Sequence, residues 1–431
     1  MKHSLCALLV LALLACLMGC GMADDDYAAS IRLNMASETA KAEVSVKTFV
    51  DGDTVHFNIS ADVMPSGVLK ARFLAVNTPE TTGKIEEYGK KAADFTRDKL
   101  SRATSIIIES DDDGWNLDST AQRHLVWVWY KTPDMTDYRN LNIEILQNGL
   151  AIANATAQNR YGSVCMAALN HAREQKLNVY SGQKDPDFYY GDAIELTLKE
   201  LRTNPQTYNG KKVAFKGVIT MNHNNAVYIE DFDPETGLYY GMSVYYGYGL
   251  NGTGLDILSV GNESRIVGTM QYYEAGGTWQ VSGLTYRMMK PKDPGNIQLL
   301  SQGHEAAWVP TPAETFANGV VTVQGEDSTA DFAYANLALA TSVSMENLTV
   351  VDVYTTTDED SSSNGAMTLT CQCDGVTILV RTAVLYHDDQ TLVTGDEFLG
   401  KTISVRGVVD YFDGAYQIKV LSLNGITIAN E

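Results

Sequence analysis

The chain has 431 residues, which is too many for one hydrophobic core and enough for two to four domains. Its 45% hydrophobic and 20% charged residues are typical of an ordinary globular protein. The net charge of −21 is unevenly spread: residues 44–182 carry 15 basic and 17 acidic side chains, whereas residues 183–431 carry 14 basic and 31 acidic ones. The second part would repel a polyanion at long range, while the first part could still bind one through a local cluster.

The first residues have the pattern of an export signal. Lys2 precedes an apolar run, 5–18, which is shorter than the roughly 20 residues that span a bilayer. The run ends in "LMGC", which resembles the processing site of bacterial lipoproteins and implies cleavage before Cys20 and a diacylglycerol on its sulfur. "LLAC", ending at Cys16, is a weaker candidate, and a plain secretory signal or anchor is the alternative.

We therefore expect a signal peptide at 1–19 and a solvated tether at 20–43. Two or three acyl chains anchor a protein stably, where one would be marginal. The expected location is outside the cytoplasm, on the periplasmic or cell surface of a bacterial membrane.

Residues 44–182 mix strand and helix patterns. "VSVKTFVDGDTVHFNI" predicts a hairpin with Asp51-Gly52 in its turn, and "HLVWVWY" predicts a strand. Helical spacing is found in "YGKKAADFTRDKL", "NLNIEILQNGLAIAN" and "SVCMAALNHAREQKLNVY". The pattern favours a small barrel with interleaved helices.

After residue 182 the chain becomes rich in Gly, Tyr, Thr and Val, with short strands and frequent turns. "GKKVAFKGVIT" at 210–220 and "GKTISVRGVVD" at 400–410 are similar, and 264–284 repeats the pattern more loosely, which suggests a duplication. The mid-strand glycines suit sharply bent strands, so 192–290 and 313–431 resemble small barrels of the oligonucleotide/oligosaccharide-binding (OB) type. A proline-rich stretch separates them.

The ligands of these two barrels stay open, because the fold does not fix them. The run "GLYYGMSVYYGYGL" at 237–250 could stack nucleic-acid bases, or its alternate tyrosines could simply pack in a strand. Nucleic acid, glycan and protein are all candidate ligands.

Residues suited to phosphodiester hydrolysis gather in 44–182. Such a reaction needs a cation, a base for water and donors for the developing negative charge. Guanidinium groups grip phosphate oxygens, and carboxylate and carbonyl oxygens suit calcium. The residues with this chemistry are Asp51, Asp53, Arg72, Asn77, Thr78, Glu80 and Arg123.

Residues 44–182 resemble the staphylococcal nuclease (thermonuclease) family. "DGDTV", "RFLAVNTPET", "EEYGKKAADFT", "RHLVWVW", "NGLA" and "EQKLNVYSG" occur in the order and near the spacing of that family. The resemblance implies a five-stranded OB-type barrel with three helices and calcium-dependent cleavage of DNA and RNA that leaves a 3′-phosphate. By position it implies these roles: calcium ligation by Asp53, Asn77 and Thr78, a general base at Glu80, and phosphate binding by Arg72 and Arg123.

Two positions depart from the family. Asn77 replaces a second calcium-binding aspartate, so the site has one negative charge fewer and calcium affinity should fall. Ala155 and Ala157 stand where the family has two tyrosines around the bound nucleotide, so the pocket should hold a terminal nucleotide less tightly.

The sequence thus predicts a mainly β protein with α-helices, in which a thermonuclease-type barrel is followed by two smaller OB-type barrels. The expected function is a lipid-anchored, calcium-dependent nuclease. The alternative is a surface protein that binds nucleic acid, glycan or protein without cutting.

Overall fold

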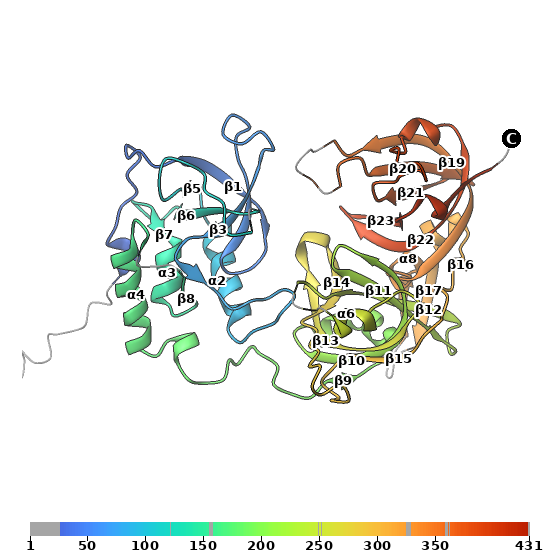
Figure 1. Ribbon diagram of the computed structural model, residues 1–431, viewed down its shortest axis with the longest axis horizontal. Coiled ribbons are helices and arrows are strands. Elements are labelled where there is room, and N and C mark those ends of the chain that lie inside the picture. Colours follow the sequence, from blue (N-terminus) through green and yellow to red (C-terminus); the bar gives the residue numbers. More distant parts are fainter. Residues whose placement is uncertain are drawn as a thin grey trace, which may run out of the picture.

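The computed structural model describes residues 26–429, apart from residues 121, 155–157, 249, 251, 325–328, 358–360 and 362. The described chain is mainly β, with short helices, and contains three closed five-stranded barrels (Figure 1). The predicted fold class is therefore confirmed. No helix in the described part is long and apolar enough to cross a membrane.

All three barrels share one pairing scheme. In each, the first strand pairs with the second and the fourth, and the third strand lies parallel to the fifth. This is the pairing of an OB barrel, in which full closure leaves no exposed sheet edge among the five strands.

The first barrel carries the helices that the sequence predicts. Its five strands are β1 (Lys41–Phe49), β2 (Thr54–Asn58), β3 (Val68–Phe73), β5 (Ser105–Glu109) and β6 (His124–Lys131). Its helices are α2 (Gly89–Ser101), α3 (Leu141–Gln147) and α4 (Gly162–Glu174), and its short elements are η1 (Tyr27–Ala29), β4 (Val76–Asn77), β7 (Arg139–Asn140), β8 (Ile152–Ala153) and η3 (Asn178–Tyr180). Helix α3 begins at Asn140, whose side chain accepts the Ile143 N–H.

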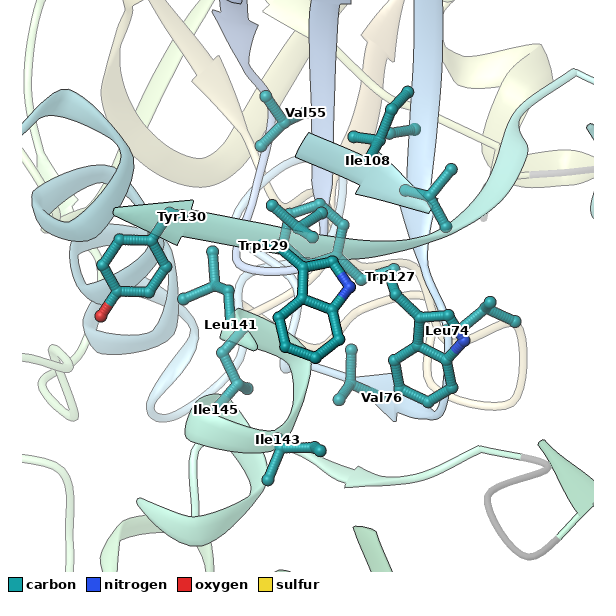
Figure 2. Close-up of a cluster of buried hydrophobic side chains, with 14 of the residues drawn as sticks. Val55, Leu74, Val76, Ile108, Trp127, Trp129, Tyr130, Leu141, Ile143 and Ile145 are labelled. Carbon is teal, nitrogen blue, oxygen red and sulfur yellow. The ribbon is translucent and has the colours of Figure 1, made fainter. Parts of the chain in front are cut away.

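The core of this barrel lies between β6 and α3. Alternate positions of β6 place Trp127 and Trp129 on one side of the strand, and both are fully buried in one cluster with Leu141 and Ile145 of α3 (Figure 2). The Trp129 Nε1–H donates to the buried Glu109 carboxylate at 2.9 Å, so this polar atom is satisfied.

The second and third barrels complete the chain. The second is formed by β10 (Lys212–His223), β11 (Ala226–Asp233), β12 (Leu238–Tyr245), β13 (Glu263–Tyr273) and β14 (Thr278–Ser282), with β9 (Ile194–Glu195), α5 (Leu198–Thr203), η4 (Pro205–Tyr208), α6 (Thr253–Ile257), η5 (Glu274–Gly276) and β15 (Gln298–Ser301). The third is formed by β19 (Ser342–Thr355), β20 (Met367–Cys373), β21 (Val376–Thr382), β22 (Thr402–Phe412) and β23 (Ala415–Val420), with β16 (Val309–Pro310), η6 (Gly395–Glu397), η7 (Leu423–Gly425) and β24 (Ile426–Ile428).

The inferred duplication was aligned on the wrong strands. Residues 210–220 form the first strand of the second barrel, whereas 400–410 form the fourth strand of the third. The equivalent of β22 is β13, the looser repeat at 264–284. Both β10 and β22 pair across the seam that closes a barrel, β10 with β13 and β22 with β19, and each carries a glycine, Gly217 or Gly407, that packs closely against a further neighbouring strand.

The segment between the second and third barrels is not a free linker. Its β15 pairs with β13 of the second barrel and its β16 pairs with β19 of the third. The following α7 (Ala313–Asn318), β17 (Val320–Gln324), β18 (Thr329–Ala333) and α8 (Tyr334–Leu337) pack on both barrels, because Val323 joins the core of the second and Phe316 that of the third.

A buried carboxylate joins these two barrels. Glu230 of β11 accepts hydrogen bonds from the Ala307 N–H at 2.9 Å and from the Ser342 N–H and hydroxyl at 2.6 and 2.8 Å. Burial raises the pKa of Glu230, and the three donors oppose that rise. The second and third barrels are therefore joined by a buried carboxylate whose hydrogen bonds are made to protein groups, and not by a water-filled gap.

Part of the segment expected as a tether packs against the first barrel. Ala28 in η1 is fully buried, and its N–H donates to Gln147 of α3 at 3.0 Å. Asp26 pairs with Arg139 through two hydrogen bonds, 2.6 and 2.8 Å long.

The close contact of Gly217 with the neighbouring strand β11 gives a stability prediction. A Cβ at Gly217 in β10 would lie 2.6 Å from the Glu230 carbonyl oxygen, and that backbone cannot move without distorting the barrel. We expect Gly217→Ala to destabilise the protein by about 1–3 kcal/mol, measured by urea unfolding. Gly114→Ala, where the nearest atom is a side-chain oxygen 3.7 Å away, is the control and should change stability little. Equal effects of the two changes would refute the role of close packing between Gly217 and β11.

Candidate active site

The predicted site residues meet at one end of the first barrel. Asp53 precedes β2 and Arg72 lies near the end of β3, and the antiparallel register that pairs Thr54 with Arg72 places the two side by side. The parallel register of β3 and β6 pairs Arg72 with Leu125, so Arg123, directly before β6, lies at the same end. Strand pairing alone therefore gathers residues that lie up to 70 positions apart.

The Asp53 carboxylate is fully buried and fully paired. It forms an ion pair with Arg72, accepts the Thr78 N–H at 2.7 Å and accepts the Thr54 hydroxyl at 3.1 Å. A buried charge requires such partners, because removing it from water costs several kcal/mol. Asp53 thus fixes the position of the turn that contains Thr78.

Arg72 also holds Asn77. Its Nη2 donates to the Asn77 Oδ1 at 2.6 Å, while its Nη1 faces Asp53. Burial lowers the pKa of the Arg72 guanidinium, and the negative charge of Asp51 opposes that change. One guanidinium therefore contacts oxygens of two of the three expected calcium ligands.

Glu80 lies half-buried in the loop before α2. Its N–H donates to the Glu86 carboxylate at 3.1 Å, and its carbonyl accepts the Glu86 N–H at 3.0 Å. A Cβ at Gly89 would lie 2.5 Å from the Glu80 carbonyl oxygen, so only glycine lets α2 begin this close. Burial and the charge of Asp51 raise the pKa of Glu80, against the attraction of Arg72.

Arg123 is the more accessible of the two arginines. Its Nε donates to Asp118 at 2.7 Å and its Nη1 to the Thr54 hydroxyl at 3.5 Å, while about a third of its side chain stays exposed. Burial alone would raise the pKa of Asp118, but the Thr120 hydroxyl and Arg123 lower it to about 2. Arg123 is thus oriented by a carboxylate that stays ionised, with room for a further anion.

Three residues of this site were not assigned a role from the sequence. Asp51 accepts the Asp53 N–H at 3.0 Å, and burial raises its pKa. Asp118 orients Arg123, and Glu86 holds the backbone of Glu80. Asp51 was visible in "DGDTV" and Glu86 in "EEYGKKAADFT", but no sequence pattern indicates the contacts through which Glu86 and Asp118 act.

The atoms that could act as metal ligands in this site are of the kind that a hard cation binds. Asp51, Asp53 and Asn77 offer only oxygen, which is what calcium prefers. Across the described ranges no three His, Cys, Asp or Glu side chains are grouped as a metal site, which agrees with an amide at position 77. Because Arg72 contacts Asp53 and Asn77, a cation at those oxygens would have to displace the guanidinium.

Three residues singled out in the sequence lie outside the described residues. They are Cys20, the expected lipidation site, and Ala155 and Ala157, which replace the family's tyrosines. In the tyrosine-rich run, Tyr240 is fully buried in the core of the second barrel, whereas Tyr248 is 86% exposed.

The loop that follows Glu80 lies against the second barrel. The Gln271 Nε2–H of β13 donates to the Thr81 carbonyl at 2.7 Å, and Arg97 of α2 forms an ion pair with Glu274. A Cβ at Gly283 would lie 2.8 Å from Ile85, so the second barrel meets the loop closely. Figure 1 shows this loop reaching from the first barrel toward the second.

Comparison with known families agrees with this geometry. Residues 70–182 match the family model described as "Staphylococcal nuclease homologue". The match includes Arg72, Glu80 and Arg123, whereas Asp53 precedes it and joins the site through the pairing of β2 with β3. No curated protein matches the chain. Residues 70–182 are thus a staphylococcal nuclease-like domain.

The contact between the loop and the second barrel can be tested. We expect Gln271→Ala to raise the hydrogen–deuterium exchange rate of residues 81–87 several-fold, because the backbone of Thr81 loses its partner. Gln372→Ala removes a comparable amide hydrogen bond, to Thr377 in the third barrel, and should leave this loop unchanged. Unaltered exchange in Gln271→Ala would show that the barrel does not order the loop.

Proposed function

We propose that the chain is a calcium-dependent nuclease that hydrolyses phosphodiester bonds of DNA or RNA and leaves 3′-phosphate ends. The observation that carries the proposal is the joint position of Arg72, Arg123 and Glu80 beside the buried Asp53 carboxylate. An arginine–carboxylate pair that served only as a surface contact would not be buried in this way. The nuclease-like match over the same residues supports it.

Each residue has a role that its environment allows. Arg123, oriented by Asp118 and partly exposed, binds a phosphate oxygen of the substrate. Arg72 cannot lose its charge at neutral pH and stabilises the negative charge that develops on the phosphate. Glu80, whose pKa is raised, takes a proton from the attacking water.

A calcium ion would be held by Asp53, Asn77 and the Thr78 carbonyl. When bound, it would polarise a phosphoryl oxygen. The site carries one carboxylate fewer than the family pattern, so we expect calcium to bind weakly, which a calcium-rich compartment outside the cell can tolerate.

We also propose that Cys20 is lipidated and that the protein is anchored to a bacterial membrane, facing the periplasm or the cell exterior. The pattern of residues 1–20 supports this location. Degradation of nucleic acid at the cell surface would follow from anchoring and activity together.

One observation favours a second candidate function. Arg72 already contacts the Asp53 and Asn77 oxygens that a cation would need, so the site is neutralised without metal. A protein fixed in that state would bind nucleic acid, glycan or protein ligands without cutting.

Cleavage of single-stranded DNA by the soluble chain that starts after Cys20 separates the two functions. We expect calcium-dependent cutting, a loss of about 10²–10⁴-fold in Glu80→Gln, and a lower calcium requirement in Asn77→Asp. Glu87→Gln, an exposed glutamate in the same loop, is the matched control and should cut at the wild-type rate.

The opposite result has a definite meaning. A wild-type protein that is inert at millimolar calcium, together with cutting by Asn77→Asp, would refute the nuclease and leave the binding function. Cutting that persists in Glu80→Gln would refute the proposed base.

The pH dependence of cutting provides a further test. Glu80 acts as a base only when ionised, and its pKa is raised by burial and by Asp51. The rate should therefore fall as pH drops through the pKa of Glu80, and this fall should be absent in Glu80→Gln. The measurement is the pH profile of kcat/KM of both proteins at saturating calcium. An acidic limb that is unchanged in Glu80→Gln would contradict Glu80 as the titrating group.

A further inference from the structure

A pocket lies between the second and third barrels, outside the candidate active site of the first. It has a volume of about 450 Å³, within the range of small-ligand sites. Both barrels contribute to its lining, through Arg202 and Trp279 from the second and Tyr411 and Tyr416 from the third, with Asn336 from the connecting segment.

Arg202 is a buried cation without a carboxylate partner. Its side chain donates from Nε and Nη2 to the Gly241 carbonyl, at 3.2 and 2.6 Å, and from Nη2 to the Leu339 carbonyl at 3.2 Å. The residue is only 5% exposed, and within the described part of the chain no acidic side chain forms an ion pair with it. Buried charges are normally paired with an opposite charge.

The positive charge persists at neutral pH. Burial lowers the pKa of Arg202 to about 10, and the nearby Tyr416 hydroxyl opposes the change. The Nη1 group carries no hydrogen bond to a described residue, although Nε and Nη2 are both used. The pocket therefore has an uncompensated charge and a free donor in its lining.

Aromatic rings form the other walls of the pocket. Tyr411 and Tyr416 lie with ring centroids 5.0 Å apart, and Trp279 packs edge-on to Tyr272 at 5.1 Å, so neighbouring rings fix their orientation. Trp279, Tyr411 and Tyr416 are only partly buried, which leaves ring surface for a ligand. The Asn336 Nδ2 donates to the Tyr416 hydroxyl at 3.0 Å.

We propose that this pocket binds a small organic anion, in which one phosphate or carboxylate group is attached to a ring. Arg202 contacts the anionic group and supplies a charge-assisted hydrogen bond, and Trp279 and Tyr411 contact the ring. Nucleoside monophosphates and acidic monosaccharides share this chemistry. The high negative charge of residues 183–431 repels a polyanion more strongly than a single small anion.

Calorimetric titration of the soluble chain tests the proposal. The probes are thymidine 3′-monophosphate, glucuronate, thymidine and inorganic phosphate, with EDTA present so that calcium does not support binding at the first barrel. We expect one of the two ring-bearing anions to bind, and to bind more tightly than thymidine or phosphate alone. Which of the two binds identifies the source of the ligand.

Variants then locate the binding. Arg202→Gln keeps an amide donor but removes the charge, and should weaken binding about tenfold or more. Lys216→Gln removes a charge from an exposed side chain of the same barrel and should have no effect. Trp279→Leu should weaken binding by loss of ring contact, and serves as the second test where Arg202→Gln does not fold.

The proposal is overturned by either of two results. One is that neither ring-bearing anion binds at millimolar concentration. The other is that binding is unchanged in both Arg202→Gln and Trp279→Leu. Neither result bears on the nuclease, which is assayed separately by calcium-dependent cutting.

Discussion

The carboxylate of Asp53 lies inside the first barrel, where an unpaired negative charge would cost several kcal/mol. Its three partners, Arg72, the Thr54 hydroxyl and the Thr78 N–H, come from two strands and the turn that follows β4. The need to pair the Asp53 carboxylate with these three partners fixes the register of β2 against β3 and the start of the loop that carries Glu80. The remaining groups of the site are arranged around this buried charge.

Asparagine at position 77 fits the same electrostatic arrangement. With Asp51 and Asp53 already buried at this end of the barrel, a third carboxylate would add repulsion unless a cation were bound. The amide oxygen of Asn77 accepts a hydrogen bond from Arg72 and adds no charge. An amide at this position thus lets the site remain stable when it holds no metal.

Much of this arrangement could be predicted from sequence because it depends on local patterns and one strand register. The hairpin at Asp51-Gly52, the helices α2, α3 and α4, and the grouping of Arg72 with Asp53 are of this kind. Contacts between barrels could not be predicted, since Gln271 and Thr81 are 190 positions apart and no sequence pattern pairs these two positions. The duplication was misaligned because β10 and β22 both pair across the seam of a barrel and both carry a closely packed glycine, so similar sequences occur at different places in the barrel.

The pairing of Asp26 with Arg139 limits how far the first barrel can stand from an anchor. Asp26 follows Cys20 by six residues, and a fully extended chain of that length spans about 20 Å. An acyl group on Cys20 would therefore hold the barrel within one domain diameter of the lipid headgroups. Only strands that approach the membrane surface closely could then enter the site, so the protein would act on polymers that reach the cell, not on those in the bulk medium.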